Sequence, residues 1–293
     1  MGRIRPHLWY DTEAREAATL YTSTFPSSRI TDDTTLKGTP GADTDVIAFE
    51  LFDQAFMAIS AGPLFTFTPA VSFFVACETK DEVDQYWNAL NEGRDPMMPL
   101  GSYPFSEHYG WTQDRYGLSW QIGVAGNGTV MQRITPSLLF VGDVCGKAEE
   151  ALRLYTSLFP KSEVGLLDHY GDGEGPDKPG TLRFGTFTLE GQQFNAMDSA
   201  LDHKFTFNEA ISLMVDCETQ DEIDHYWDAL SAVPEAERCG WLKDRWGLSW
   251  QIVPAAMDEM LRTGSPEQIA RVTETFLKMH KLDLAELQRA HDG

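Results

Sequence analysis

A thirteen-residue block that occurs twice constrains this chain more than any other feature. Residues 110–122 read GWTQDRYGLSWQI and residues 240–252 read GWLKDRWGLSWQI, so ten of the thirteen positions are identical at a spacing of 130 residues. In each copy an apolar segment leads through an Asp-Arg-aromatic-Gly turn into a Leu-Ser-Trp-Gln-Ile run. Such a pattern predicts a β-hairpin. We therefore expect a fold that is built twice.

The repeat extends over most of the chain. The corresponding segments are strands 4–10 and 134–140, helices 13–25 and 147–159, strands 46–51 and 182–189, strands 56–60 and 194–198, strands 71–78 and 211–218, and helices 81–90 and 221–230. Thr79 and Thr219 stand at N-cap positions, with Glu82 and Glu222 three residues later, which is a capping-box pattern. Each half is predicted to run β-α-β-β-β-α-β-β.

The boundary between the halves falls at residues 123–129, whose glycine-rich composition is typical of a linker. We predict domains at 1–128 and 129–293. The second half alone carries a tail, in which Ser265 caps a helix that has Pro266 at its first position and runs to about Lys281. Asp283 opens another helix, to about residue 291. We expect this tail to pack across a domain or subunit surface.

The charge balance excludes several classes of partner. The chain has 45 acidic and 23 basic residues, for a formal net charge of −22. Such a surface repels phosphate backbones and anionic lipids, so we expect no nucleic acid and no membrane partner. No apolar run reaches the roughly 18 residues of a membrane span.

Cysteine use and the N-terminus bear on the compartment. Four cysteines without a Cys-x-x-Cys spacing are too few to staple 293 residues, which favours buried or partly buried free thiols. The first residues lack the apolar core of a signal peptide. We therefore expect a cytoplasmic protein.

Four segments carry a resemblance to a known family. They are residues 208–212 (NEAIS), 217–222 (CETQDE), 226–230 (YWDAL) and 239–254, the last of which contains the hairpin. They are similar to the PhnB-like branch of the vicinal oxygen chelate superfamily, which includes glyoxalase I, bleomycin-resistance proteins and extradiol dioxygenases. The branch is often labelled 3-demethylubiquinone-9 3-methyltransferase-like. The resemblance implies an α+β fold of tandem glyoxalase-like domains, each of two βαβββ modules forming a cup-shaped mixed sheet, here with added C-terminal helices.

Metal-dependent members of the superfamily place a His on the first strand and a Glu on the last strand of each module. The equivalent positions here hold Pro6, Pro136, Ser72 and Ser212 on first strands and Gln121 and Gln251 on last strands, and the remaining position falls near Asn195 or Met197 in the second half and Met57 or Ile59 in the first. Proline and isoleucine cannot ligate a divalent ion, and neutral Gln or Ser are weak ligands. We therefore predict no metal centre and no cofactor.

The methyltransferase label is not supported by a donor-binding motif. Such an enzyme needs a glycine-rich turn that opens a helix, so that the helix N-terminus approaches the cofactor. The only Gly-x-Gly-x-Gly run, at 171–175, continues into Pro-Asp-Lys-Pro-Gly, which predicts a loop. We expect no methyltransferase activity.

The glutamines of the repeated block are the most prominent polar candidates. Strand alternation places Gln251 and Ser249 on one face and Trp250 on the other. The Gln251 amide either binds a ligand in the cup or satisfies backbone groups inside the barrel, and its twin Gln121 has the same two interpretations. Further ligand-binding candidates are Ser212, Asn195, Phe207, Asn208 and Ser72.

Two residues are weak candidates for a general base. Glu209 and His203 belong to a segment that borders the cup in the family. The first half reads FTFTP at 65–69 where the second reads FTFNE at 205–209, so the C-terminal cup is the better candidate. We expect the repeated Asp-Arg pair (Asp114 and Arg115 in the first copy) to hold a turn by local contact rather than to bind substrate.

Three functions remain open at this stage. The first is metal-free binding of a small apolar or aromatic molecule in the cup. The second is an enzyme of the superfamily, of lyase, isomerase or dioxygenase type, that uses Glu209 or an unrecognised metal. The third is a structural or regulatory pseudo-enzyme whose duplicated domain mimics a homodimer. Whichever function holds, the chain is either a monomeric pseudo-dimer or a homo-oligomer.

Overall fold

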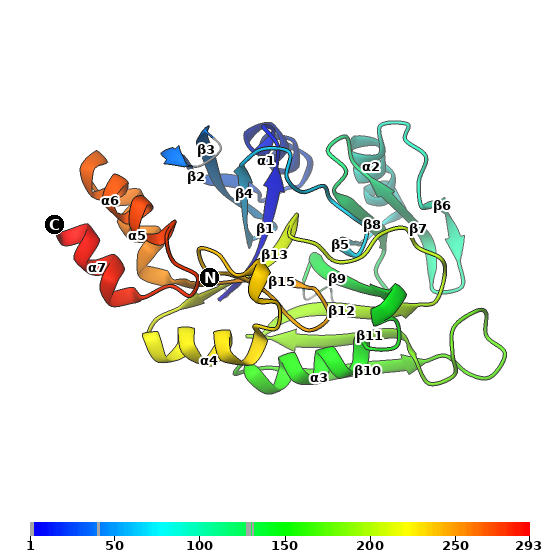
Figure 1. The fold of residues 1–293 in the computed structure, drawn as a ribbon. Coiled ribbons are helices and arrows are strands. Elements are labelled where there is room, and N and C mark those ends of the chain that lie inside the picture. Colours follow the sequence, from blue (N-terminus) through cyan, green and yellow to red (C-terminus); the bar gives the residue numbers. More distant parts are fainter. Residues whose placement is uncertain (1–2, 40–41, 127–129, 131) are drawn as a thin grey trace.

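The structure is a computed structural model that describes residues 3–39, 42–126, 130 and 132–293. The predicted α+β fold is confirmed, with two mixed β-sheets and helices packed on them (Figure 1). Sheet A has the strand order β14-β15-β13-β1-β4-β3-β2, and sheet B has the order β10-β11-β12-β9-β5-β8-β7-β6.

The elements follow the predicted repeat. In the first half they are β1 (Ile4–Tyr10), α1 (Ala14–Thr24), β2 (Arg29–Thr39), β3 (Ala42–Leu51), β4 (Gln54–Ser60), β5 (Val71–Cys77), α2 (Lys80–Asn91), β6 (Met98–Tyr103), β7 (Ser106–Gln113) and β8 (Ser119–Val124). In the second half they are β9 (Ile134–Val141), α3 (Ala148–Leu158), β10 (Glu163–His169), β11 (Leu182–Leu189), β12 (Gln192–Ser199), β13 (Ile211–Cys217), α4 (Gln220–Leu230), β14 (Trp241–Lys243) and β15 (Ser249–Pro254). The tail holds α5 (Ala255–Thr263), α6 (Pro266–Phe276) and α7 (Leu284–Asp292).

Each sheet combines one module from each half of the chain. In sheet A the first-half strand β1 pairs antiparallel with β13, so that Leu8 lies opposite Ile211. In sheet B the first-half strand β5 pairs antiparallel with β9, so that Ser72 lies opposite Ser137. Each sheet thus has its two modules, but they come from different halves.

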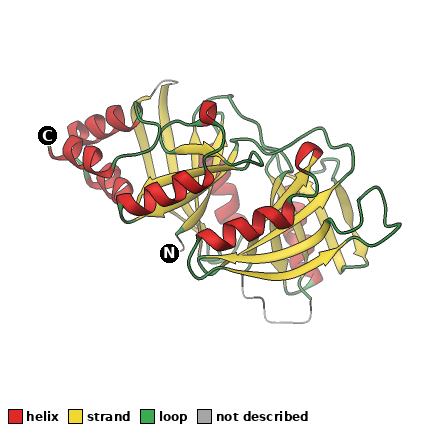
Figure 2. Ribbon diagram, turned by 60° about the horizontal axis from the view of Figure 1, so that its bottom comes forward, coloured by secondary structure: helices red, strands yellow, loops and turns green. Residues whose placement is uncertain are grey.

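Aromatic contacts nevertheless join the two helices of each half, within one core cluster that spans both halves. In the first half α1 meets α2 through the rings of Phe25 and Tyr86, whose centroids are 5.0 Å apart. In the second half α3 meets α4 through Phe159 and Tyr226, at 4.6 Å. These helices cover one face of each sheet (Figure 2). We call the opposite face, turned away from α1 and α4 in sheet A and from α2 and α3 in sheet B, the inner face.

The repeated block forms the predicted hairpins, β7–β8 and β14–β15. Asp114 holds the first turn, because its carboxylate accepts the backbone N–H groups of Tyr116 and Leu118. The expected Asp-Arg contact is wrong: Arg115 pairs instead with Glu92.

The buried carboxylate of each turn also binds two aromatic side chains. Asp114 accepts hydrogen bonds from the Tyr21 hydroxyl at 2.6 Å and from Trp120 Nε1 at 2.9 Å. Asp244 does the same with Tyr155 and Trp250, at 2.6 and 3.0 Å. The block is therefore repeated because it ties each hairpin to the helix α1 or α3 of its own half.

Several element boundaries differ from prediction. Strand β8 extends through Val124 into the predicted linker, and residues 127–129 of that linker lie outside the described residues. Strands β2, β6 and β10 and helix α5 were not predicted. Helix α6 ends at Phe276 rather than near Lys281, whereas α7 matches its prediction.

The expectations about the cysteines and about membrane-spanning segments can be compared with the structure. All four cysteines are free thiols, and three of them are buried. Among the described residues, no helix has both the length and the apolar character that crossing a membrane requires.

Candidate functional site

Strand register decides which side chains reach the inner face of sheet A. His7 lies opposite Ser212 on one side and Met57 on the other, and its ring meets the edge of Trp241 at 5.5 Å. Its neighbour Pro6 points to the other face. The predicted first-strand position was therefore one residue off, and a shift of one residue exchanges the faces of a strand.

The four central side chains of this inner face are His7, Met57, Ser212 and Gln251. Gln251 Nε2 donates to Ser212 Oγ at 2.7 Å. Burial, reinforced by the nearby Arg5 charge, lowers the pKa of His7 to about 3, so its imidazole is neutral. One imidazole beside a thioether, a hydroxyl and an amide does not fit the tetrahedral or octahedral donor sets of divalent metals.

The equivalent set on sheet B is entirely neutral. Its members are Ser137, Asn195, Ser72 and Gln121. Gln121 Nε2 donates to Ser72 Oγ at 2.8 Å, and Asn195 Nδ2 donates to Ser137 Oγ at 3.1 Å. The described residues contain no group of three or more His, Cys, Asp or Glu able to hold a metal ion. The residues present therefore do not fit the superfamily's metal.

The predicted ligand-binding residues are divided between the two sheets. Gln251, Ser249 and Ser212 lie on the inner face of sheet A. Gln121, Ser72 and Asn195 lie on that of sheet B. Residues of the C-terminal half therefore do not share one cup, because the modules pair across the halves.

Two further ligand-binding candidates lie away from both inner faces. Phe207 is buried in the helix-side core, where its ring meets that of Phe140 at 5.0 Å. Asn208 Nδ2 donates to the backbone carbonyl of Thr66 at 2.8 Å and so links two loops from different halves.

The two candidate bases do not come together. Glu209 forms an ion pair with Lys243 at 2.8 Å, beside sheet A. His203 lies just after β12 of sheet B, and its Nε2 is 2.9 Å from the Ser199 hydroxyl. Partial burial lowers the pKa of His203.

The C-terminal helices cover the inner face of sheet A. In Figure 1 they stand beside β2 and β3, on the side away from sheet B. One apolar cluster joins Met57, Met214 and Val253 of the sheet with Met260, Val272, Phe276, Leu282 and Leu287 of the tail. An ion pair of 2.8 Å between Arg5 on β1 and Asp258 on α5 adds a polar link.

The inner face of sheet B carries a different apolar cluster. Its members are Phe74, Met98, Tyr103, Tyr109, Trp111, Leu139, Val141, Met197 and Phe205, and none belongs to a helix. The Tyr109 hydroxyl donates to Gln121 Oε1 at 2.7 Å, and Trp111 Nε1 donates to Ser119 Oγ at 2.8 Å. We call these aromatic side chains the wall, and the neutral set Ser137, Asn195, Ser72 and Gln121 the floor. The bond from Tyr109 to Gln121 joins the wall directly to the floor.

The β6–β7 hairpin extends this wall. Tyr103 and Phe105 bring their rings to 5.7 and 5.0 Å from Tyr109. Phe105 is 66% exposed, which is unusual for a phenylalanine and places an aromatic ring at the rim. Strand β6 and the start of β7 fall in the 91–109 segment, where the first half is longer than the second.

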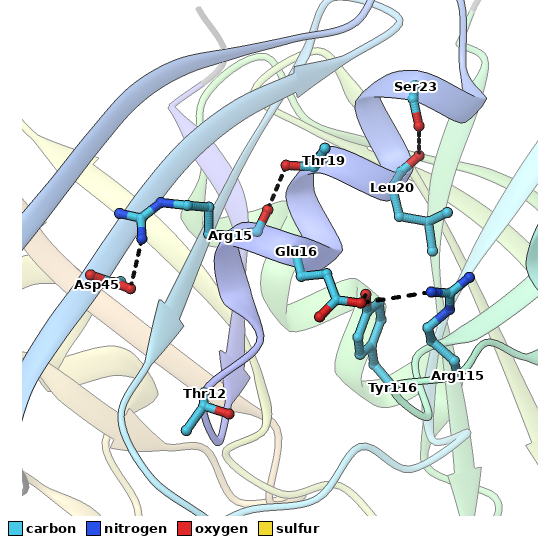
Figure 3. Close-up of a pocket in the computed structure, with 9 residues that line it drawn as sticks. All are labelled: Thr12, Arg15, Glu16, Thr19, Leu20, Ser23, Asp45, Arg115 and Tyr116. Carbon is cyan, nitrogen blue, oxygen red and sulfur yellow. Dashed lines mark hydrogen bonds and ion pairs between the residues drawn. The ribbon is translucent and has the colours of Figure 1, made fainter.

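A groove of about 530 Å³ lies between α1 and the turn after β7, on the helix side of the molecule (Figure 3). Its charged side chains are already paired: Arg15 with Asp45 at 3.1 Å, and Glu16 with Arg115 at 3.6 Å. Because these charges neutralise each other, the groove is a weak candidate for binding a charged ligand.

Comparison with known families decides the identity of the fold. The sequence model described as 3-demethylubiquinone-9 3-methyltransferase matches residues 2–123 and again 132–253. The chain belongs to this family, in two tandem copies. Residues 254–293 of this PhnB-like chain, which form the tail, lie outside both matches.

Two solved structures that are similar to the chain illustrate its relatives. A Bacillus cereus PhnB protein, described as a putative 3-demethylubiquinone-9 3-methyltransferase, is 40% identical over 41% of this chain and 98% of its own, with a TM-score of 0.39. A point mutant of glyoxalase I from Zea mays is 9% identical over 86% of this chain and 93% of its own, with a TM-score of 0.52. The latter supports the glyoxalase-like fold alone. No curated protein matches the chain.

The glycine-rich run that was compared with a cofactor-binding turn is a loop in the structure. The Gly-x-Gly-x-Gly run at 171–175 connects β10 to β11, two antiparallel strands, as a loop. It therefore opens no helix whose N-terminus could approach a cofactor.

Proposed function

We propose that the inner face of sheet B binds a small, uncharged aromatic or apolar molecule without a metal. The observation that carries the proposal is the wall of aromatic side chains, centred on Tyr109 and Trp111, on a floor of amide and hydroxyl groups. Ligand sites in proteins combine such apolar walls with a few placed polar groups. The aromatic rings supply contact area and the floor supplies orientation.

The neutral floor argues for an uncharged ligand. The floor residues Gln121, Ser72, Asn195 and Ser137 offer hydrogen bonds but no charge. An ionised ligand would lose its hydration there without gaining an opposite charge. A hydroxyl or carbonyl group on an aromatic ring suits the floor better.

The choice of sheet B reverses the expectation from sequence. The C-terminal residues Gln251 and Glu209 favoured the other cup, but the tail helices cover the inner face of sheet A. Glu209 is also neutralised by Lys243, which weakens its case as a general base. Neither an acid-base enzyme nor a methyltransferase gains support from these contacts.

Fluorescence titration with N-phenyl-1-naphthylamine, a neutral aromatic probe, tests the proposal. We expect saturable binding to the full chain, weakened at least tenfold by Trp111→Ala. The matched control is Trp9→Ala, which removes a partly buried tryptophan of sheet A and should leave this binding unchanged. Thermal melts of both variants check that each folds. No saturable binding, or equal weakening by both substitutions, would overturn the proposal.

A further inference from the structure

The tail is the largest departure of this chain from its own repeat. Residues 254–293 lie outside both family matches. The 40%-identical Bacillus cereus relative corresponds to a single copy, since 98% of its length aligns with 41% of this chain. The tail is therefore an addition to the repeated unit, and it is seated on only one of two equivalent inner faces.

Half of the floor of sheet B is repeated beneath the tail. The Gln251–Ser212 hydrogen bond of 2.7 Å corresponds to the Gln121–Ser72 bond of 2.8 Å. Trp241 stands opposite Gln251 as Trp111 stands opposite Gln121. Sheet A thus has the Gln-Ser pair and one tryptophan in common with the binding face of sheet B, whereas Cys239 stands where sheet B has Tyr109.

The covered face also holds a buried serine hydroxyl without a hydrogen-bond partner, whereas the equivalent serine of sheet B has one. Ser249 is fully buried and its Oγ has no hydrogen-bond partner, whereas the twin Ser119 accepts a hydrogen bond from Trp111. The difference arises because Trp241 turns its ring toward His7. An unpaired buried hydroxyl costs free energy that a hydrogen-bonding ligand would recover.

One contact between the tail and the sheet is an ion pair on helix α5. Arg5 lies between Asp216 of β13 and Asp258 of α5, at 2.6 and 2.8 Å. Burial raises the pKa of Asp216 to about 6, although the Arg5 charge opposes the shift. Asp258 is the one member of this trio on the tail, and its side chain is 44% exposed. Breaking this ion pair therefore loosens α5 without removing a group from the sheet.

We propose that the inner face of sheet A is a second site for an uncharged aromatic molecule, closed by α5–α7 as an intramolecular cover. The inference rests on the proposed function for the class of ligand. It assigns Gln251, Ser212 and Ser249 to the floor of this second site and Trp241 to its wall. Helix α5 follows β15 directly, so the cover swings from residues 254 and 255. It is held at Arg5 and also by residues 279–284, which bond to Cys239, Gly240 and helix α4.

Charge reversal at the anchor tests the cover in the full chain. Asp258→Arg replaces the ion pair with Arg5 by a repulsion. The matched control is Glu259→Arg, the adjacent residue, which pairs with the exposed Arg262 of its own helix. Two readouts are needed: hydrogen exchange of residues 255–292, and the number of N-phenyl-1-naphthylamine molecules bound per chain.

We expect Asp258→Arg to raise exchange in the tail at least tenfold and to add one bound probe per chain, and Glu259→Arg to do neither. The cover is overturned if exchange in the tail is unchanged, or if exchange rises throughout both sheets, since the tail is then part of the folding core. The second site is overturned if the tail loosens and no probe is added. Should the wild-type chain bind no probe while Asp258→Arg binds one, the second site stands and the proposal for sheet B fails.

Discussion

The histidine at the centre of sheet A shows how one buried group couples the fold to pH. His7 is 2% exposed, and burial lowers its pKa to about 3. In the unfolded chain the same side chain has a pKa of about 6.5. Between these values the unfolded state binds a proton that the folded state does not, so stability falls as the pH drops through this window.

We expect His7→Gln to reduce this acid sensitivity. Between pH 7 and pH 5 the histidine alone accounts for about 2 kcal/mol of lost stability, from its two pKa values. Urea denaturation at the two pH values measures the loss, and the variant should lose about 2 kcal/mol less than the wild type. His280→Gln, at an exposed histidine, is the control and should behave as the wild type. Equal losses in wild type and His7→Gln would contradict the assignment.

For single residues, the sequence predicted which polar side chains share a face of one strand, but not which of them come together from different strands. Strand alternation correctly put Gln251 and Ser249 on one face and Trp250 on the other. The alignment with the family misplaced the first-strand position by one residue, at Pro6 instead of His7. Burial alternation could not correct it, because the residues from Ile4 to Leu8 are all buried. The partners of Asp114 lie up to 93 residues away, so no local pattern could indicate them.

The three strands that were not predicted were missed for the same physical reason. Strands β2, β6 and β10 lie at the edges of their sheets. An edge strand does not need an apolar side chain at every second position, and charged residues there discourage pairing with other chains. Strand β2 reads RITDDTTLKGT and β10 reads EVGLLDH, so neither shows the alternation that predicts a strand.

The repeated glycines of the hairpins serve different needs in the two copies. A Cβ atom on Gly110 would lie 2.2 Å from Cζ3 of Trp87, so β7 can approach α2 only without a side chain there. Gly240 instead has a φ of +86°, a backbone conformation that favours glycine. A glycine at the same position of both copies therefore has a different structural reason in each.

We expect Gly110→Ala to destabilise the chain by about 2 kcal/mol, because the buried Trp87 ring must move to admit the methyl group. Urea denaturation measures the effect. Gly126→Ala is the matched control, since a Cβ there meets no atom within 4 Å. If Gly110→Ala unfolds at the same urea concentration as the control, the close approach of β7 to α2 is not as described.

Over the whole molecule, the pairing of modules across the halves could not be read from the sequence. The repeat makes the two first-strand segments similar and the two fifth-strand segments similar, so pairing within a half and pairing between halves satisfy the same pattern. The structure has β1 on β13 and β5 on β9, with five residue pairs in each ladder. Matching ion pairs support both junctions, Arg3 with Glu222 at 2.7 Å and Arg133 with Glu82 at 3.1 Å.

This arrangement makes the peptide link between the halves dispensable for holding them together. Separation of the halves would expose the edges of four central strands, whose backbone groups would lose their partners. We therefore expect a chain cut once between residues 124 and 133, at an inserted protease site, to remain a single particle. Size-exclusion chromatography with mass determination measures this, and the uncut chain with the same insertion is the control. Two folded fragments that elute separately would show that each half is an independent domain and that neither sheet is continuous across the halves.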